Sequence, residues 1–382
     1  MLTNSRKKIC FIVSSFGTAR SFLQEPFKYL AKEFDIYLVA NIKESDDLSD
    51  MYLTGHKSIP IERRPNLRYD YIALNSMISY FKEMKFDSVH SLTKKASLLT
   101  TIAGRIANIP YRLHHFTGQM WTTMHGLRKF IYKHMDTFIV WSDTHMLVDG
   151  FSQMEFLEDT SILRKGEATV LANGSICGIN TNRFSPDSKI REELRSNMQI
   201  SNDTVVYIFL GRLKREKGIY ELLAAFNQLT VEAPNAVLLL VGKDEENCIE
   251  SLPNYSNIHI GKNLIFYGFT PRPEDLYRAA DVYVLPTYRE GFGLSILEAS
   301  CSGLPVITTD TYGVRDSIID NETGLRCKTY DIETLKNAML QLYTNESERK
   351  RLGDNGIKYV HENFTTEIVC NAWLEYYKKV LQ

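Results

Sequence analysis

The sequence lacks the features that would place the chain across a membrane, in an oxidising compartment or around a structural metal. No stretch approaches the roughly 18 unbroken apolar residues of a membrane span, and Lys7-Lys8 leads into a short apolar run rather than a signal peptide. The six cysteines are dispersed without a CxxC pair, which favours a reducing compartment and no structural zinc. We expect a cytoplasmic protein, with contact at the inner face of the cell membrane left open.

Two further signatures are missing. There is no GxGxxG followed by an acid about 20 residues later, so an NAD oxidoreductase is not indicated. No DxD run lies in a suitable loop, and the histidines between 114 and 145 have spacings that fit no compact ligand motif. We therefore expect neither a metal nor a cofactor.

Length and composition indicate a two-domain soluble enzyme. A chain of 382 residues is long for one core, and 44% hydrophobic with 24% charged residues is ordinary for a globular enzyme. The net charge of −1 combines 23 Lys/Arg and 18 Asp/Glu in residues 1–185 with 22 and 28 in the remainder. This asymmetry indicates either an anionic partner surface on the first half or ordinary surface scatter.

Strand-length apolar runs alternate with helical patterns along both halves, which predicts an α/β protein with doubly wound parallel sheets. The predicted strands are 8–14, 34–40, 88–91, 111–116, 137–141, 203–210, 236–242, 264–268, 281–286 and 304–309. The predicted helices are 22–30, 72–81, 93–106, 126–134, 218–229, 274–280 and 366–381. We expect domains at 1–185 and 186–363, followed by a C-terminal segment, 364–382, that packs on the first domain.

The stretch Tyr288–Pro305 holds two carboxylates around a glycine loop. Glu290 lies beside two glycines after a predicted strand, and Glu298 lies within a predicted helix. A helix that begins after glycines offers unpaired N–H groups and a positive dipole end, which suit a phosphate. Acids on both sides of such a seat are best explained as hydroxyl acceptors flanking a pyrophosphate. A nucleotide sugar has this arrangement of groups.

Basic residues follow another strand of the second half. Arg212 and Lys217 lie in the segment from Gly211 to Gly218, where two cations beside a helix start suit a pyrophosphate leaving group. Gly242 and Phe269 end two further strands, where a base can lie against the backbone. Gly17, after the first strand, is either a phosphate-loop glycine or a simple turn.

In the first half, a loop follows the strand that ends at Phe116. Ligands gather at the carboxyl ends of strands in doubly wound sheets, so the segment from His115 to Gln119 is a candidate site. The acceptor-side candidates are His114, Thr117, Gly118, Gln119 and Lys94. The basic side chains Lys94, Lys95, Arg128, Lys129 and Lys133 either contact anionic lipid or form solvated helix faces.

These motifs together resemble the family-4 retaining glycosyltransferases. The resemblance is carried by Glu290 and Glu298 with seven residues between them, by Gly211-Arg-Leu with Lys217-Gly218, and by Ala280-Asp-Val-Tyr-Val-Leu-Pro286. It covers essentially the whole chain and implies the GT-B fold, two Rossmann-like domains with a C-terminal helix that returns to the first. The segment Leu113–Trp121 resembles that of bacterial capsule, O-antigen and exopolysaccharide transferases.

The resemblance also implies roles for the residues. Glu298 is expected to hold the ribose hydroxyls and Glu290 the sugar hydroxyls, while Arg212 and Lys217 hold the diphosphate. Phe292, Gly293 and Leu294 are expected to contact the donor through the loop and its backbone N–H groups, and His115 or its neighbour His114 to contact the donor sugar.

The predicted activity is metal-independent transfer of a hexose or N-acetylhexosamine from a UDP-sugar to a glycan, here a lipid-linked one. The departing diphosphate is expected to accept the proton of the incoming hydroxyl on the same face, so a glycosidase-like pair of carboxylates is not needed. A GDP-sugar donor, as in a mannosyltransferase, and a GT-B-fold nucleotide-sugar epimerase are the alternatives. Nucleic acid is not an expected partner.

Overall fold

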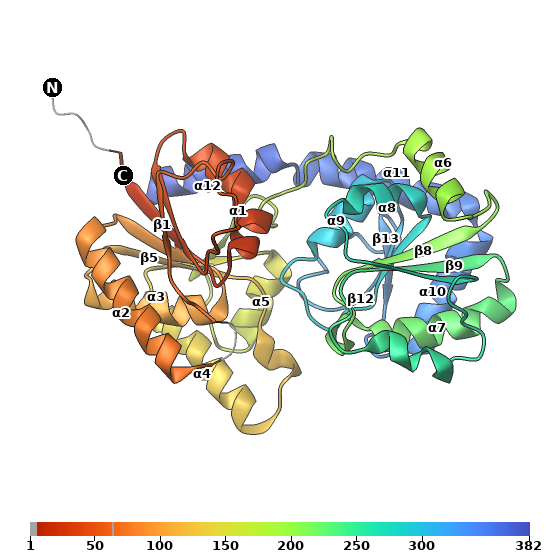
Figure 1. Cartoon of the computed structure of the whole chain (residues 1–382), viewed down its shortest axis with the longest axis horizontal. Coiled ribbons are helices and arrows are strands. Elements are labelled where there is room, and N and C mark those ends of the chain that lie inside the picture. The colour runs from red at the N-terminus through yellow and green to blue at the C-terminus, as the bar shows by residue number, and fades with distance from the viewer. Residues whose placement is uncertain (1–5, 63–64) are drawn as a thin grey trace. The chain divides into compact units, whose positions relative to one another are not determined.

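The computed structural model describes residues 6–62 and 65–382 and separates into two compact units. The first unit runs to Gly178 and includes Thr366–Gln382, and the second comprises Ile179–Thr365. Each unit is a parallel sheet with helices on both faces (Figure 1). The predicted α/β class with parallel sheets is confirmed.

The first unit has a seven-stranded sheet in the order β3-β2-β1-β4-β5-β6-β7. Its strands are β1 Lys8–Ile12, β2 Asp35–Ala40, β3 Gly55–Ser58, β4 Ser88–Ser91, β5 Tyr111–Phe116, β6 His145–Val148 and β7 Ala168–Val170. Its helices are α1 Phe16–Leu30, α2 Leu67–Met84, α3 Lys94–Ile106, the 3-10 turn η1 Met120–Thr123, α4 Gly126–Ser142, α5 Phe151–Asp159 and α12 Thr366–Val380.

The second unit has a six-stranded sheet in the order β10-β9-β8-β11-β12-β13. Its strands are β8 Val205–Leu210, β9 Ala236–Val241, β10 Leu264–Gly268, β11 Val282–Leu285, β12 Val306–Thr309 and β13 Gly324–Cys327. Its helices are α6 Ser188–Asn197, α7 Ile219–Glu232, α8 Pro273–Ala279, α9 Leu294–Cys301, α10 Ile332–Thr344 and α11 Glu346–Asn363, with 3-10 turns η2 Arg215–Lys217 and η3 Cys248–Asn254.

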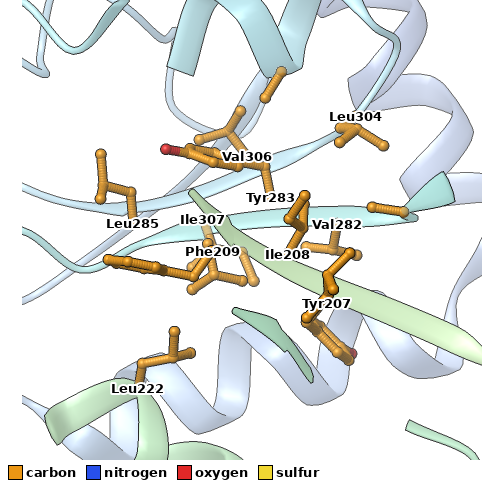
Figure 2. Close-up of a cluster of buried hydrophobic side chains, with 14 of the residues drawn as sticks. Tyr207, Ile208, Phe209, Leu222, Val282, Tyr283, Leu285, Leu304, Val306 and Ile307 are labelled. Carbon is orange, nitrogen blue, oxygen red and sulfur yellow. The ribbon is translucent and has the colours of Figure 1, made fainter. Parts of the chain in front are cut away.

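The core of the second unit lies around its central strands. Tyr207, Ile208 and Phe209 of β8 are fully buried, and they pack with residues of β11 and β12 and with Leu222 of α7 (Figure 2). Strands buried on both faces consist of continuous apolar runs, which is why the sequence predicts β8, β9 and β11 so clearly. The order of the sheet reverses at β8, because β9 pairs on one side of it and β11 on the other. Ligands of open α/β sheets bind at the carboxyl ends of strands at such a reversal.

The C-terminal helix α12 is part of the first unit. Trp373 and Tyr377 on its inner face are fully buried, and the Trp373 indole N–H donates to the carbonyl of Ile176 over 2.8 Å. The Tyr377 hydroxyl lies 2.6 Å from Nδ1 of His90 on β4. The apolar positions of the predicted helix therefore complete the core of the first unit.

The predicted strand over 137–141 is wrong, because these residues form the second half of α4. Four apolar residues follow Thr137 without interruption, as in a buried strand, yet only Ile139 among residues 137–141 is buried. The unit's strand follows instead at β6, which pairs with β5 and β7. The sequence also gave no prediction of β3, β7 or β13, which are short strands of three or four residues.

Among the helices in the described part of the chain, none has the length and apolar character needed to cross a membrane.

One glycine fixes where the second unit's loops meet. Gly218 separates η2 from α7 with a φ of 72°, and a Cβ at this position would lie 2.0 Å from the carbonyl oxygen of Pro286, the residue after β11. Backbone this close leaves no room for a side chain, and positive φ favours glycine as well. The loop after β8 is thereby pressed against the end of β11.

This contact predicts the effect of a methyl group at the position. Gly218→Ala is expected to lower the free energy of unfolding by more than about 2 kcal/mol, because the clash with Pro286 adds to the cost of positive φ. Gly166→Ala is the matched control: its φ is 79°, but nothing lies within 4 Å of an added Cβ, so it should cost about 1 kcal/mol. Denaturant unfolding measures both, and equal losses would contradict the role of the clash.

Candidate functional site

The candidate site of the second unit is built where the loops after β8 and β11 are joined. The carbonyl of Glu216 in the first loop accepts from the Thr287 hydroxyl over 3.2 Å and from the Tyr288 N–H over 2.9 Å in the second. The Thr311 hydroxyl, after β12, donates to the carbonyl of Tyr288. Three strand ends therefore hold one another in place.

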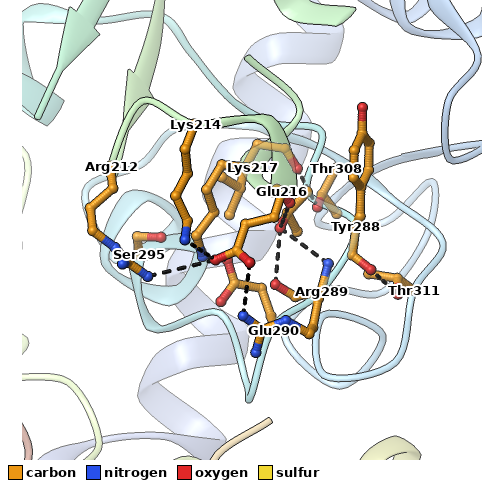
Figure 3. Close-up of polar contacts among 12 residues, drawn as sticks. Arg212, Lys214, Glu216, Lys217, Tyr288, Arg289, Glu290, Ser295, Thr308 and Thr311 are labelled. Carbon is orange, nitrogen blue, oxygen red and sulfur yellow. Dashed lines mark hydrogen bonds and ion pairs between the residues drawn. The ribbon is translucent and has the colours of Figure 1, made fainter. Parts of the chain in front are cut away.

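Lys217 and Glu290 meet across this junction. The Lys217 ammonium forms an ion pair with a carboxylate oxygen of Glu290 (Figure 3). Each side chain is 15% exposed, so the pair is partly shielded but open on one side. The two residues were predicted from separate motifs 73 positions apart, and the fold brings them together.

Glu216 is the centre of a second charge network. Its carboxylate lies 2.6 Å from Lys214 Nζ and 3.0 Å from a guanidinium nitrogen of Arg289, with Arg212 at 3.7 Å. Burial by itself would raise the pKa of Glu216, but Arg289 and Lys214 outweigh it and lower the pKa to about 2. Arg212 also reaches Glu245 over 3.3 Å and remains 46% exposed.

The two other cations of this loop differ in exposure. Lys214 is only 17% exposed because Glu216 binds it, whereas Arg215 is exposed. The sequence identifies Arg212 and Lys217 of this loop as candidates, but not the acid Glu216 between them.

The loop before α9 turns at Gly293, whose φ of 79° allows the chain to enter the helix at Leu294. The Tyr283 hydroxyl lies 2.8 Å from the Ser295 hydroxyl in the first turn, so β11 supports the start of α9. Phe292 is 3% exposed and packs against Phe364. Its side chain is a core residue, and only its backbone is available to a ligand.

Glu298 lies one turn further along α9. The Tyr277 hydroxyl of α8 donates to its carboxylate over 3.1 Å. Burial raises the pKa of Glu298 to about 7, and the hydrogen bond from Tyr277 opposes this rise only in part. A carboxylate with so much of its solvation removed and one protein donor has acceptor capacity left for hydroxyl groups.

The remaining donor-side candidates line the neighbouring strand ends. Gly242, after β9, is so close to Gly211 that a Cβ would lie 1.8 Å from the Gly211 carbonyl oxygen. Phe269, after β10, has 79% of its surface exposed. The Phe269 ring is therefore available to stack on a flat ligand. The glycine at position 242 keeps side-chain atoms away from the backbone nearby.

The candidates of the first half lie in the first unit. His115 is 1% exposed, and its Nε2 lies 3.0 Å from Asp149 Oδ1, while its ring is 5.5 Å from that of Trp373 on α12. His114 points to the other face of β5, where Nδ1 lies 3.3 Å from the Ser91 hydroxyl. Burial lowers the pKa of His114 to about 3, so this ring stays neutral.

The other first-unit candidates are dispersed around the strand ends. Gly17 lies in the first turn of α1 with open space beside it. Thr117 donates to the carbonyl of Leu92 over 3.5 Å, Gly118 has a φ of 102°, and Gln119 is fully buried. Lys94 is bound to Asp136 over 3.1 Å.

Sequence reasoning missed the residues that support the site rather than line it. Tyr277, Tyr283, Glu216 and Arg289 position the predicted groups through contacts between different elements. Glu216 lies inside the segment from Gly211 to Gly218, and its position between basic residues is the feature that could have identified it. For the two tyrosines the sequence offers no signal, because each contact depends on how α8 and β11 pack against α9.

Two parallel-sheet units, with the C-terminal helix returning to the first, are the architecture of the GT-B fold. A solved structure with the same fold is that of Anabaena Alr3699/HepE in complex with UDP and glucose, which has a TM-score of 0.82 and 16% identity over 98% of this chain and 100% of that one. Residues 190–359, within the second unit, match the glycosyl transferases group 1 family.

Relatives of known description cover most of the chain. It is 29% identical over 352 residues to the capsular polysaccharide biosynthesis glycosyltransferase CapM of Staphylococcus aureus, spanning 92% of this chain and 91% of the relative. It is 27% identical to the UDP-Gal:alpha-D-GlcNAc-diphosphoundecaprenol alpha-1,3-galactosyltransferase of Escherichia coli, over 85% of this chain and 84% of that protein. The predicted resemblance to surface-polysaccharide transferases is confirmed.

The pKa of Glu298 predicts a pH-dependent cost to stability. Because folding raises this pKa from 4.5 to about 7, the folded state favours the protonated acid, and stability falls as the pH rises through this range. Glu298→Gln should therefore match the wild type below pH 4.5 and exceed it at pH 8, by at most about 3 kcal/mol.

Glu216→Gln is the matched control with the opposite sign. Its pKa is lowered, so its ionised form stabilises the fold above the ordinary glutamate pKa and the variant should be less stable than the wild type at pH 8. Urea unfolding of the three proteins at both pH values makes the comparison. A Glu298→Gln variant that loses stability at pH 8 would contradict the raised pKa.

Proposed function

We propose that the protein is a retaining, metal-independent glycosyltransferase that moves a hexose or N-acetylhexosamine from a UDP-sugar to a lipid-linked glycan. The observation that carries the proposal is the Lys217–Glu290 ion pair beside the start of α9. Lys217 can bind a diphosphate through its positive charge, and Glu290 can accept hydrogen bonds from the hydroxyl groups of a sugar.

The diphosphate is proposed to lie between Lys217 and the first turn of α9. Its charge replaces that of Glu290 as the partner of the ammonium. The first N–H groups of α9 have no acceptor one helical turn earlier and form the positive end of the helix dipole, although that of Ile296 donates to the Gly293 carbonyl over 2.9 Å. Arg212 is more exposed and can turn from Glu245 to the phosphate. Stabilising the departing diphosphate is then the main catalytic contribution of the chain.

The carboxylates take the two ends of the donor. Glu290, released from Lys217, accepts hydrogen bonds from the sugar hydroxyls, and Glu298 accepts them from the ribose. Phe269 offers a surface for the base. The incoming hydroxyl loses its proton to the departing diphosphate on the face from which that group leaves, which retains the anomeric configuration.

The choice of UDP and of a lipid-linked acceptor is supported by the relatives. The Escherichia coli relative is named as a transferase from UDP-Gal to a diphosphoundecaprenol-linked sugar, and the Anabaena structure is described with UDP and glucose. The Staphylococcus aureus relative is named for capsular polysaccharide biosynthesis. We infer the same nucleotide and the same class of product for this chain.

Removing either cation should slow transfer strongly without unfolding the protein. Lys217→Ala and Arg212→Ala are expected to lower kcat by on the order of 100-fold, because each removes a charge that stabilises the leaving diphosphate. Arg215→Ala, an exposed cation in the same loop, is the control and should keep normal turnover. Release of UDP from a panel of UDP- and GDP-sugars is the readout, and unchanged turnover in Lys217→Ala would refute the assignment.

Glu298 should act on nucleotide affinity rather than on turnover of bound donor. If its carboxylate accepts the ribose hydroxyls, Glu298→Gln weakens UDP binding, and wild-type affinity falls as the pH is lowered below about 7, where the free enzyme takes up a proton at this site. Calorimetric titration with UDP at pH 6 and pH 8 measures both effects. A pH-independent affinity shared by wild type and variant would exclude the ribose contact.

A further inference from the structure

Helix α4 turns an apolar stripe toward solvent. Leu127 is 72% exposed, Phe130 59% and Trp141 70%, and Ile131 and Phe138 are exposed as well. Their spacing of three, four and seven residues places them on one side of the helix, along about 21 Å of its axis. Figure 1 shows α4 at the periphery of the first unit.

The inner face of α4 fixes this orientation. Asp136 is buried on that face and accepts from the Trp121 indole N–H over 2.7 Å and from Lys94 over 3.1 Å. Ile139 and Ser142 are buried on the same side. Turning the helix to bury the stripe would expose Ile139 and break the contacts of Asp136, so the apolar side chains are held outward by the fold.

Basic side chains border the stripe. Arg128 is exposed on the flank of the stripe, next to Leu127 and three residues before Ile131. The Arg105 guanidinium at the end of α3 lies 4.6 Å from the centre of the Trp141 ring. Residues 88–135 contain seven Lys or Arg and no Asp or Glu. Lys94 and Lys95 are bound by Asp136 and Asp70, so the accessible positive charge is concentrated around α4.

We propose that α4 is a membrane-docking helix that lies in the interface of an anionic lipid bilayer. A helix with aromatic and aliphatic side chains on one face and cations along its edge binds this way, with the apolar face at the level of the acyl chains and the cations among the phosphate groups. The depth of α4 in the bilayer is set by its apolar side chains at both ends, Trp141 at one and Leu127 with Phe130 at the other.

The charge pattern favours a bilayer over a second copy of the chain. In a symmetric dimer through this face, the same patch lies on both subunits, so Arg128 and Arg105 would face another positively charged border. Like charges opposed across an interface are unfavourable. An anionic surface neutralises the border and covers the stripe at once.

The position of Trp141 makes docking directly measurable. Of the three tryptophans, Trp121 and Trp373 are buried and Trp141 is exposed. Vesicles of phosphatidylglycerol with phosphatidylcholine should shift the emission of the wild type to shorter wavelength, and phosphatidylcholine alone should shift it far less. Trp141→Phe should remove the shift and keep the binding, which is followed by co-sedimentation.

Two variants with matched controls test the surface itself. Phe130→Glu and Arg128→Glu are expected to weaken binding to the anionic vesicles by about tenfold or more. The first places a charge in the apolar face, and the second reverses a charge at its border. Val231→Glu and Lys189→Glu place a charge at an apolar position and reverse a charge at exposed sites of the second unit, and they should bind normally. Melting temperatures exclude misfolding, since all four side chains are exposed.

Three outcomes would overturn the proposal. They are no binding to anionic vesicles, equal binding by Phe130→Glu and the wild type, and a blue shift that appears without lipid as protein concentration rises, which would identify a second copy as the occupant. The assay contains no sugar donor and no glycan. Its outcome is therefore independent of the proposed transfer activity.

Discussion

The close approach of Gly218 to the carbonyl of Pro286 determines the arrangement of the second unit's site. It presses the loop after β8 onto the end of β11, and this places Lys217 opposite Glu290. The hydrogen bonds from Thr287 and Tyr288 to Glu216 hold the same junction from the other side. Since the two loops come from the strands on either side of the sheet reversal, a local backbone contact fixes a site built from distant segments.

The positive charges of the site are matched by carboxylates of the chain itself. Glu216 binds Lys214 and Arg289, Glu290 binds Lys217, and Arg212 reaches Glu245. Unpaired cations held together in partly buried positions would repel one another and lower stability. In the proposed donor complex, a diphosphate replaces Glu290 as the partner of Lys217. The same proposed exchange would free the Glu290 carboxylate for sugar hydroxyls.

The sequence predicts the elements with strong periodicity and the site residues in compact motifs. β8 and β9, buried on both faces, are identified by their apolar runs, and the candidate residues Arg212, Lys217, Glu290 and Glu298 by their spacing. The tyrosines that support α9 could not be predicted, because their contacts depend on how separate elements pack. Phe292 stays a predicted donor contact through its backbone, and its motif gives no sign that its side chain belongs to the core. Burial of a single side chain is a property of the tertiary structure.

The error over 137–141 has the most instructive physical cause. Apolar residues of a surface helix normally lie on one face, and their period reveals the helix. In α4 the inner face is apolar at Ile139, while Phe138 and Trp141 continue the apolar character on the outer face. The period disappears, and the run resembles a buried strand. Folding buries only one of the two apolar faces of α4. The exposed stripe and the sequence pattern that resembles a strand therefore have the same cause. Natural surfaces seldom retain several large apolar side chains in one row unless something covers them. The failure of the periodicity is therefore itself evidence for a second contact surface on this helix.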